Sequence, residues 1–326
     1  MSENSGSVAQ DFEPSPERLA ASRENRRKGR RFGWLLGDTI FDRVRVDFGL
    51  RFLHRVMKLD HLSYGMWDGD PMSVAGLRAA QKRYAETLAA MVPEGVERIL
   101  DVGCGVGGTA AMLGRRGYEV EGVSPDPYQQ EVFTARTGRP FHLSRFELYE
   151  PDRSFDLIMM SESAQYIMLD QLFRTVMAHN PGCYLLVADY FRVADVSGPI
   201  GKSGHRLEDF LDEAGRWGFE IVEKLDITEQ ALPTLELGRQ WVENYVGPSI
   251  EIFGESVTSR SPLLGRILRL VSHFKKRSWK RQIQLMDAEK FREGKKYLFF
   301  LFKAPQSMAD LARLHRENTG GASPKK

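Results

Sequence analysis

A chain of 326 residues, 42% of them hydrophobic, is long enough to bury one large core, or one core with a substantial appendage. Its 46 lysine and arginine residues are nearly balanced by 44 acidic residues, so the formal net charge of +2 predicts no overall attraction to nucleic acid. The N-terminus lacks a signal-peptide pattern and no apolar run approaches the roughly 18 residues of a membrane span, so we expect a soluble, cytoplasmic protein.

The first 92 residues divide into two segments. Residues 1–31 are rich in Ser, Glu and Arg and end in a run of basic side chains, which predicts a disordered basic arm. Residues 32–92 carry apolar side chains at helical spacing, such as Ile40 and Val44, and predict a helical cap segment with a helix over Met72–Met91. We expect this cap to precede the main domain and to cover its cleft.

Residues 93–225 alternate short apolar runs with helical segments, a pattern typical of a parallel sheet with helices on both faces. With a final strand in 297–305, the sequence predicts an α/β fold with a doubly wound, seven-stranded, mostly parallel sheet. The expected strands are Arg98–Val102, Glu119–Val123, Pro140–Leu143, Phe155–Met160, Tyr184–Asp189, Glu220–Leu225 and Tyr297–Phe302, and the expected helices are Gly108–Arg115, Pro127–Arg136, Leu169–His179 and Leu207–Trp217.

Residues 226–296 separate the last two strands, although a short hairpin would suffice there. Helical patterns in Leu235–Tyr245 and Leu263–Phe274 predict a helical insert that shapes a substrate pocket. Residues 306–326 are predicted to form a flexible C-terminal tail.

Within the insert, residues 260–281 form a basic amphipathic stretch without acidic residues. Its apolar side chains, among them Leu264, Ile267 and Leu268, fall on one helical face. Such a helix can bind peripherally to an anionic membrane, or its apolar stripe can pack on the domain, and the sequence leaves both interpretations open. No base-stacking module accompanies the charges, so we expect no nucleic-acid binding.

An apolar strand runs into a glycine-rich turn and then a helix at residues 99–108. Glycine there allows close approach of a ligand and positive φ angles. Gly103, Gly105 and Gly108 also satisfy the G-x-G-x-x-G pattern of dinucleotide-binding proteins, so the glycines alone do not identify the ligand.

Asp101 favours a cationic ligand. A carboxylate two residues before the first glycine would attract the ammonium of an amino-acid ligand and repel a pyrophosphate. Ser124 and Asp126, after the second strand, suit a ribose diol, which both cofactor classes contain.

The segment Leu100–Gly107 resembles the first motif of S-adenosylmethionine-dependent methyltransferases. Gly122–Gln129 is similar to the matching segment of the cyclopropane-fatty-acid-synthase and tocopherol-methyltransferase group, and Phe155–Tyr166 is similar to the fourth motif of the tocopherol-type enzymes. His61–Asp68 resembles the aromatic segment that closes over the cofactor in both families. The resemblance, over roughly residues 57–225, implies a class I, Rossmann-like methyltransferase fold and S-adenosylmethionine as cofactor.

The resemblance also implies cofactor contacts. The glycine turn would hold the methionine half, and Ser124 and Gln129 would face the adenosine, while Asp126 stands where the group often has serine. The implied cofactor-binding residues are Ser63, Tyr64, Asp101, Gly103, Gly105, Gly107, Ser124, Asp126, Gln129 and Glu162.

Methyl transfer from a sulfonium needs mainly alignment and exclusion of water. The candidate catalytic residues follow strands, at the edge where open α/β sheets bind ligands: Glu162, Gln165 and Tyr166 after the fourth strand, and His205 after the fifth, which Asp189 closes. A base would help a hydroxyl, amine or acidic carbon acceptor. An alkene acceptor instead requires carboxylates or aromatic faces that stabilise a carbocation.

The pair Gln165-Tyr166 stands where the cyclopropane synthases have Glu-His, which argues against cyclopropanation and leaves simple methyl transfer. The seven histidines are scattered, and two cysteines, Cys104 and Cys183, provide neither a disulfide framework nor a thiolate metal site, so we expect no metal.

The sequence does not identify the methyl acceptor. We favour a small apolar or lipid-like acceptor, C-methylation and a role in lipid metabolism, with the basic stretch at 260–281 as a hypothetical membrane contact. O- or N-methylation of a small polar or natural-product metabolite is the alternative. A cofactor-binding or scaffold protein without activity is a further class.

Overall fold

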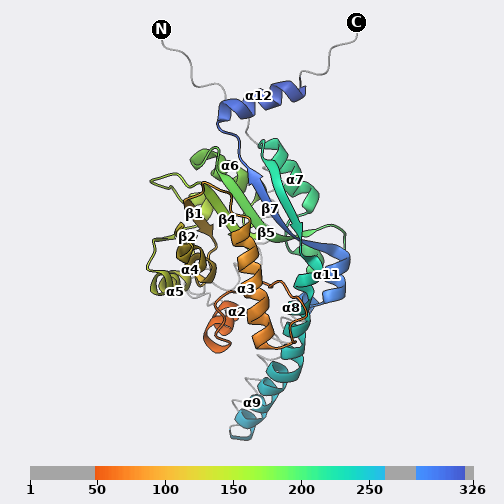
Figure 1. Ribbon diagram of the computed structural model, residues 1–326. Helices are drawn as coiled ribbons and strands as arrows, with labels where there is room; N and C mark the ends of the chain where they lie inside the picture. The colour runs from red at the N-terminus through yellow and green to blue at the C-terminus, as the bar shows by residue number, and fades with distance from the viewer. Residues whose placement is uncertain (1–47, 261–283, 320–326) are drawn as a thin grey trace, which may run out of the picture. The chain divides into compact units, whose positions relative to one another are not determined.

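A computed structural model describes residues 48–260 and 284–319 of the chain (Figure 1). The chain divides into two compact units, residues 1–51 and 52–326. The described part of the first unit is α2 (Phe48–Arg51), and the second unit contains the sheet. The expected basic arm, the pattern in Leu263–Phe274 and the basic side chains of 260–281 lie outside the described residues.

Seven strands of the second unit form one sheet in the order β3-β2-β1-β4-β5-β7-β6. Strand β7 runs antiparallel to β5 and β6, and the remaining pairs are parallel, which confirms the doubly wound, mostly parallel sheet. The strands are β1 (Arg98–Val102), β2 (Glu119–Ser124), β3 (Phe141–Leu143), β4 (Leu157–Ser161), β5 (Tyr184–Arg192), β6 (Glu220–Asp226) and β7 (Lys295–Lys303).

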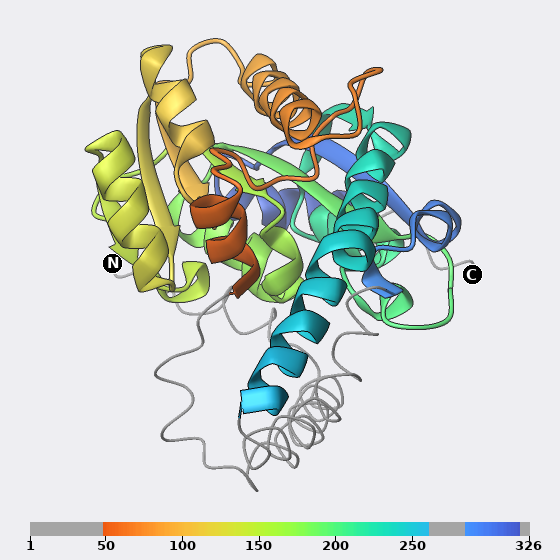
Figure 2. The same ribbon diagram turned by 90° about the horizontal axis from the view of Figure 1, so that it is seen from below.

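Helices cover both faces of this sheet (Figure 2), because its central strands are continuous apolar runs that need cover on both sides. Helices α6, α7 and α12 pack on one face, and α3, α4, α5, α8 and α11 pack on the other. The helices of the second unit are α3 (Val74–Ala90), α4 (Gly108–Arg115), α5 (Pro127–Thr137), α6 (Leu169–His179), α7 (Leu207–Arg216), α8 (Thr228–Trp241), α9 (Gly247–Arg260), α11 (Ala288–Gly294) and α12 (Met308–Thr319), with short helices η3 (Phe52–Val56), η4 (Phe146–Leu148), η5 (Ala164–Tyr166), η6 (Ile200–Lys202) and η7 (Val242–Val246).

Strands β5 and β7 are longer than their apolar runs predicted. They pair over nine residues, from Tyr184 opposite Lys303 to Arg192 opposite Lys295. Side chains of β7 alternate between the two cores, with Phe300 on the α6 side and Tyr297 on the α3 side. The antiparallel pairing therefore carries Tyr297 beneath α3.

The expectation of a flexible tail at 306–326 is wrong for its first part, because residues Met308–Thr319 form α12. The Ser307 hydroxyl accepts a hydrogen bond from the Asp310 backbone N–H at 3.1 Å, as an N-terminal cap does, and Leu311 is fully buried in the core on the α6 side. A cap and one apolar anchor are weak signals in a short polar segment, and the contact with the core is what fixes the helix.

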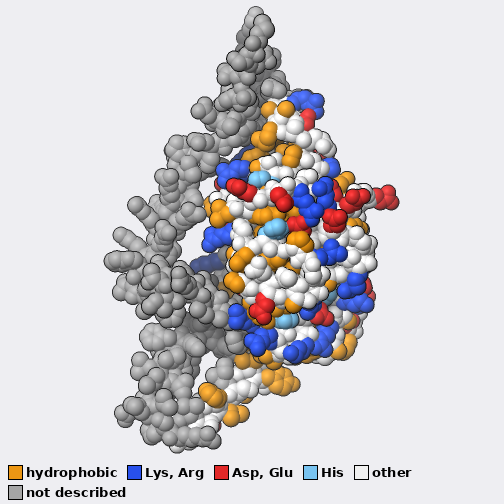
Figure 3. All heavy atoms as spheres, turned by 90° about the vertical axis from the view of Figure 1, so that its left-hand side faces the viewer, with side chains coloured by type: hydrophobic (Ala, Val, Ile, Leu, Met, Phe, Trp, Pro, Cys, Tyr) orange, Lys and Arg blue, Asp and Glu red, His pale blue; other side chains and the backbone are white. Residues whose placement is uncertain are grey.

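On the face drawn in Figure 3, acidic and basic side chains are interspersed with apolar ones. This agrees with the nearly balanced charge of the sequence. Within the described ranges, no helix is both long and apolar enough to cross a bilayer.

Candidate active site

The glycine turn after β1 leaves room for a ligand at one position. Gly103, Gly105 and Gly107 all have positive φ, at 72°, 56° and 77°. A Cβ atom at Gly103 would lie 2.5 Å from the Cβ of Ser163, and one at Gly107 would lie 2.9 Å from Phe133, so packing requires glycine at both. A Cβ at Gly105 would meet only Leu62, at 3.7 Å, so the backbone beside Gly105 is open.

Three buried polar atoms around this turn have no hydrogen-bond partner among the described residues: Ser63 Oγ, Asp101 Oδ2 and Gln129 Oε1. The fourth such atom, the Tyr149 hydroxyl, belongs to the core on the α6 side. A buried polar atom without a partner costs about 1–3 kcal/mol, so three of them around one turn indicate a ligand that satisfies them. All three belong to residues that the sequence implied as cofactor contacts.

Asp101 lies in β1, is 2% exposed, and has its pKa raised to about 7 by burial. A cationic group placed beside it would favour the ionised carboxylate and lower that pKa. The site is therefore suited to an ammonium ligand.

Ser124 and Asp126, at the end of β2, differ in their hydrogen-bond partners. Ser124 is buried, and Asp126 is the N-cap of α5, where its Oδ1 accepts a hydrogen bond from the Tyr128 backbone N–H at 2.9 Å. Gln129 follows in the first turn of α5. The Oγ of Ser124 accepts a hydrogen bond from the Asp126 backbone N–H at 3.4 Å and keeps its own proton to donate, whereas Gln129 Oε1 has no partner among the described residues.

Residues 60–64 contact the ends of three elements. Asp60 pairs with Arg136 of α5 at 2.8 Å, and His61 contacts Thr109 of α4 at 3.3 Å. The backbone N–H of Tyr64 then donates to Glu162 Oε1, just beyond β4, at 2.7 Å. The segment with Ser63 and Tyr64 thus lies over the glycine turn.

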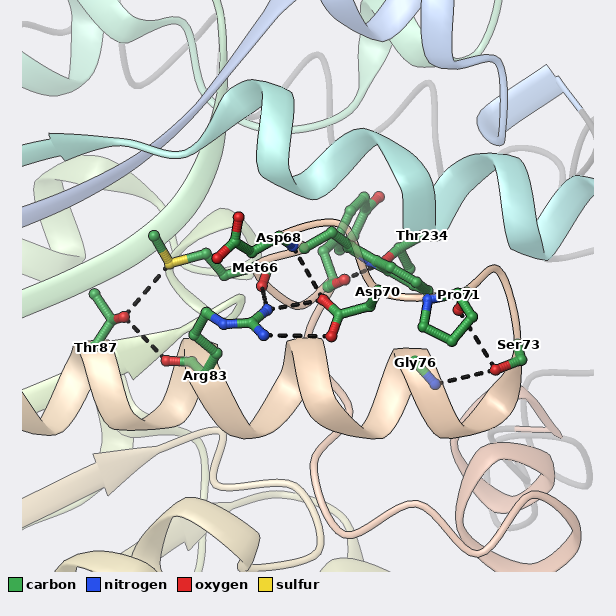
Figure 4. A network of polar contacts seen from close by, with 11 residues as sticks. Met66, Asp68, Asp70, Pro71, Ser73, Gly76, Arg83, Thr87 and Thr234 are labelled. Carbon is green, nitrogen blue, oxygen red and sulfur yellow. Dashed lines mark hydrogen bonds and ion pairs between the residues drawn. The ribbon is translucent and has the colours of Figure 1, made fainter.

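Side chains of helix α3 bind backbone carbonyls within residues 57–66, and Figure 4 shows the contacts of Arg83. Arg78 donates to the carbonyl of Met57 and Gln81 to that of Ser63, both at 2.7 Å. Arg83 donates to the carbonyl of Met66 at 2.5 Å and pairs with Asp70 at 2.9 Å.

From the other side, the hydroxyl of Thr234 in α8 donates to the carbonyl of Tyr64 and accepts a hydrogen bond from the Trp67 indole at 2.7 Å. The expected cap segment, residues 32–92, and the expected insert, residues 226–296, therefore contact each other at Tyr64.

Glu162 is half-buried and has φ 57°, a left-handed conformation that few non-glycine residues adopt. Its Oε1 accepts hydrogen bonds from the Tyr64 N–H and the Tyr297 hydroxyl, both at 2.7 Å. Burial raises the pKa of Glu162 to about 7, and these two hydrogen bonds act in the opposite direction. Among the described residues, Oε2 has no recorded partner.

Aromatic rings and a second buried carboxyl, that of Asp189, lie near Glu162. The ring of Tyr64 lies 5.6 Å from that of Tyr297 and 6.0 Å from those of Tyr190 and Phe291. Burial, and next the charge of Glu162, raises the pKa of Asp189 to about 8. These groups form one cluster at the carboxyl ends of β4 and β5.

The amine of Lys295 lies next to this cluster. It is 3.9 Å from the ring centre of Tyr190 and donates to the carbonyl and the hydroxyl of Ser203, at 3.1 and 2.6 Å. Lys295 is 1% exposed, and burial lowers its pKa to about 7.

The other candidate catalytic residues differ in how close they come to this cluster. The backbone N–H of Gln165 donates to Asp189 at 3.1 Å, and its side-chain amide donates to the carbonyl of Glu162 at 3.4 Å. Tyr166 is 80% exposed. The Nε2 of His205 lies 3.0 Å from the carbonyl of Ala164, and burial lowers the pKa of this histidine, against the effect of its backbone contacts.

Sequence reasoning missed Tyr84 and Tyr297. The hydroxyl of Tyr297 contacts both Glu162 and the hydroxyl of Tyr84, from α3, at 3.0 Å. Both are fully buried. The available signal was a tyrosine at an apolar position of a predicted helix or strand, because a buried hydroxyl needs a partner.

In the described ranges, no group of three or more His, Cys, Asp and Glu side chains is arranged to hold a metal ion.

Comparison with known proteins identifies the class. A family model described as a methyltransferase domain matches residues 77–220. Methyltransferase GfsG of Streptomyces halstedii is 30% identical over 226 residues, which cover 60% of this chain and 81% of that protein. The probable chloroplastic tocopherol O-methyltransferase of Oryza sativa subsp. japonica is 30% identical over 149 residues, 40% of this chain and 41% of that protein.

Solved structures share the fold. The geranyl diphosphate C-methyltransferase of Streptomyces coelicolor A3(2), in complex with Mg²⁺, geranyl diphosphate and S-adenosyl-L-homocysteine, superposes with a TM-score of 0.55 at 18% identity, over 77% of this chain and 92% of that one.

The sheet order, the glycine turn and these matches define a class I methyltransferase. This chain belongs to the S-adenosylmethionine-dependent methyltransferase family. The expected enzyme class, fold and cofactor are thereby confirmed.

Proposed function

We propose that this enzyme methylates a small apolar or lipid-like acceptor, with carbon as the favoured acceptor atom. The observation that carries the proposal is the half-buried carboxyl of Glu162, set among the rings of Tyr64, Tyr190 and Tyr297. Aromatic surface suits an apolar acceptor, and the hydroxyl of Tyr297 and the amine of Lys295 already donate to groups of the protein.

The cofactor supplies an electrophilic methyl group. Ser63, Asp101 and Gln129 would hold it, because each has a buried oxygen that needs a partner, and the open backbone at Gly105 would contact its methionine half. Ser124 would bind the nucleoside. These residues align the cofactor, and the segment above the turn excludes water.

Carbon methylation of a neutral acceptor leaves positive charge on that acceptor. Aromatic faces and a carboxylate stabilise such a charge, and Glu162 with Tyr64 offers both. Lys295 would oppose it, but its pKa of about 7 limits its positive charge at neutral pH.

The second candidate function is O- or N-methylation of a small polar metabolite. The name of the rice relative, an O-methyltransferase, favours it. A carboxyl with a pKa of about 7, such as that of Glu162, is also suited to accept a proton from a hydroxyl acceptor.

Methyl-¹³C-labelled S-adenosylmethionine tests the two candidates. The enzyme is incubated separately with an isoprenoid alkene, a prenylated quinol and a small polar phenol, and NMR locates the new methyl on carbon or on oxygen. We expect label on the carbon of an apolar acceptor, and a roughly hundredfold loss of turnover in Glu162→Gln with cofactor affinity retained.

The control for that variant is Glu131→Gln, which neutralises an exposed acid on α5. Label only on the heteroatom of the polar acceptor would overturn the proposal in favour of the second function. Full turnover in Glu162→Gln would remove Glu162 from the reaction.

A further inference from the structure

A row of hydroxyl groups leads to Glu162 from elements far apart in the sequence. The hydroxyl of Tyr297 in β7 lies 2.7 Å from Glu162 Oε1 and 3.0 Å from the hydroxyl of Tyr84 in α3. The hydroxyl of Tyr84 lies 2.9 Å from that of Ser161, at the end of β4. The row therefore starts and ends on neighbouring residues, Ser161 and Glu162.

Each hydroxyl has one proton, and this limits the directions of the hydrogen bonds when Glu162 is ionised. Tyr297 is placed to donate its one proton either to Oε1 or to the hydroxyl of Tyr84, and an ionised carboxylate is the stronger acceptor. With that proton on the Oε1 side, the hydroxyl of Tyr84 can supply the proton of the Tyr297–Tyr84 contact and accept one from Ser161. The backbone N–H of Tyr64 donates to the same oxygen. All of the donors converge on Oε1, and the contacts polarise one another in the same direction.

The row of hydroxyl groups also counteracts two unfavourable features of Glu162. The φ of 57° at Glu162 is strained for a residue with a side chain, and burial disfavours its charge. Tyr84 and Tyr297 are fully buried, and their rings lie 6.0 Å apart, edge to face, so the hydroxyls have little freedom to turn away. A rigid donor fixes both the position and the proton affinity of the carboxyl.

We propose that Tyr297, supported by Tyr84 and Ser161, is a positioning residue that fixes Oε1 of Glu162 and favours the ionised carboxyl, so that Oε2 remains available to the acceptor. The use of Oε2 rests on the proposed function, whereas the effect of Tyr297 on Glu162 does not. Neither tyrosine touches the acceptor in this proposal. Both act through Glu162.

Other titratable groups face this carboxyl and are common to all of the variants below. The charge of Glu162 helps to raise the pKa of Asp189 to about 8, so Glu162 ionises first, and the charge of Lys295 acts on Asp189 in the opposite direction. The facing groups are Tyr64 from the segment above the turn, Tyr84 from α3, Asp189 and Tyr190 from β5, and Tyr297 from β7.

The test measures the titration of Glu162 directly and needs no acceptor. The full chain is labelled with [5-¹³C]glutamate, the signal of Glu162 is identified by its loss in Glu162→Gln, and carboxyl shifts are followed from pH 5 to pH 9. Tyr297→Phe is expected to raise the pKa of Glu162 by about one unit, because it removes a hydrogen bond to the charged form. Tyr84→Phe is expected to raise it by less, because it acts through Tyr297.

The matched control is Tyr149→Phe, which removes a buried hydroxyl that lies in the opposite core and has no partner in the described part of the chain. It should leave the titration of Glu162 unchanged. An unchanged pKa in folded Tyr297→Phe, or an equal shift in Tyr149→Phe, would overturn the proposal. If Tyr297→Phe does not fold, Tyr84→Phe is the deciding variant. A raised pKa of Glu162 in Tyr84→Phe supports the proposal, and an unchanged pKa overturns it.

This titration is independent of the acceptor experiment. A raised pKa of Glu162 in Tyr297→Phe, together with label on the heteroatom of the polar acceptor, would keep the role of Tyr297 and reject the carbon acceptor. An unchanged pKa in Tyr297→Phe, together with label on the carbon of an apolar acceptor, would reject the role of Tyr297 and keep the carbon acceptor.

Discussion

Asp101 is a buried carboxyl whose Oδ2 atom has no partner among the described residues. Burial alone raises its pKa to about 7, since no neighbouring charge contributes to the shift. Below that pH the free protein keeps Asp101 neutral, and an ammonium ligand must displace a proton before it gains an ion pair. Affinity for the cofactor should therefore fall as the pH falls through 7.

Asp101→Asn should remove this pH dependence. The amide has the same size but no charge, and loss of a charge-assisted contact costs about 1.5–3 kcal/mol, roughly a tenfold to hundredfold loss of affinity at pH 7.5. Calorimetric titration with S-adenosylhomocysteine between pH 5.5 and 7.5 measures both effects. Glu162 and Asp189 titrate in the same range, so the difference between wild type and variant isolates Asp101. Parallel profiles for the two proteins would contradict the assignment.

At the scale of elements, α3 acts as a row of donors for the segment over the glycine turn. Arg78, Gln81 and Arg83 each bind a backbone carbonyl of that segment. The segment has no regular structure of its own between η3 and α3, so its shape depends on these bonds and on Thr234 of α8. The position of Ser63 and Tyr64 thus depends on a helix that follows them in the chain.

Arg83→Met should loosen this segment without unfolding the domain. It removes the hydrogen bond to Met66 and the ion pair with Asp70, and about 1 kcal/mol of lost interaction corresponds to a roughly fivefold weaker cofactor affinity. Hydrogen exchange of peptides from residues 61–70 should become faster. Lys82→Met is the matched control, because Lys82 is the adjacent residue of α3 and forms only an exposed pair with Glu86. Equal exchange in the two variants would show that Arg83 does not hold the segment.

At the scale of the whole second unit, part of the cover on the α6 face of the sheet comes from a segment that the sequence did not predict to be ordered. Helix α12 follows β7 and contributes Leu311 to the core that contains Phe210 and Phe302. Leu311→Ala should destabilise the protein by about 2–5 kcal/mol, because it empties a fully buried position. Met308→Ala, at a largely exposed position of the same helix, should change stability much less. Urea unfolding measures both, and equal midpoints would mean that α12 does not contribute to folding.

The sequence alone determined the sheet, the glycine turn and the cofactor class. Each of these depends on patterns within a few residues: an apolar run makes a strand, and a glycine and a carboxylate at fixed spacing make a ligand turn, as at Asp101 and Gly105. The expected strand positions accordingly agree with the structure to within a few residues.

Only the tertiary structure decided which polar groups meet. Periodicity places Tyr84 and Tyr297 in the core, but it does not reveal that their hydroxyls meet Glu162, because α3, β4 and β7 are brought together by the crossovers of the sheet. The tertiary structure also decided that Asp126 caps a helix and that His205 contacts a backbone carbonyl. Hydrogen bonds need a partner at about 3 Å, and for residues 84, 162 and 297 that proximity is a property of the fold and not of any local pattern.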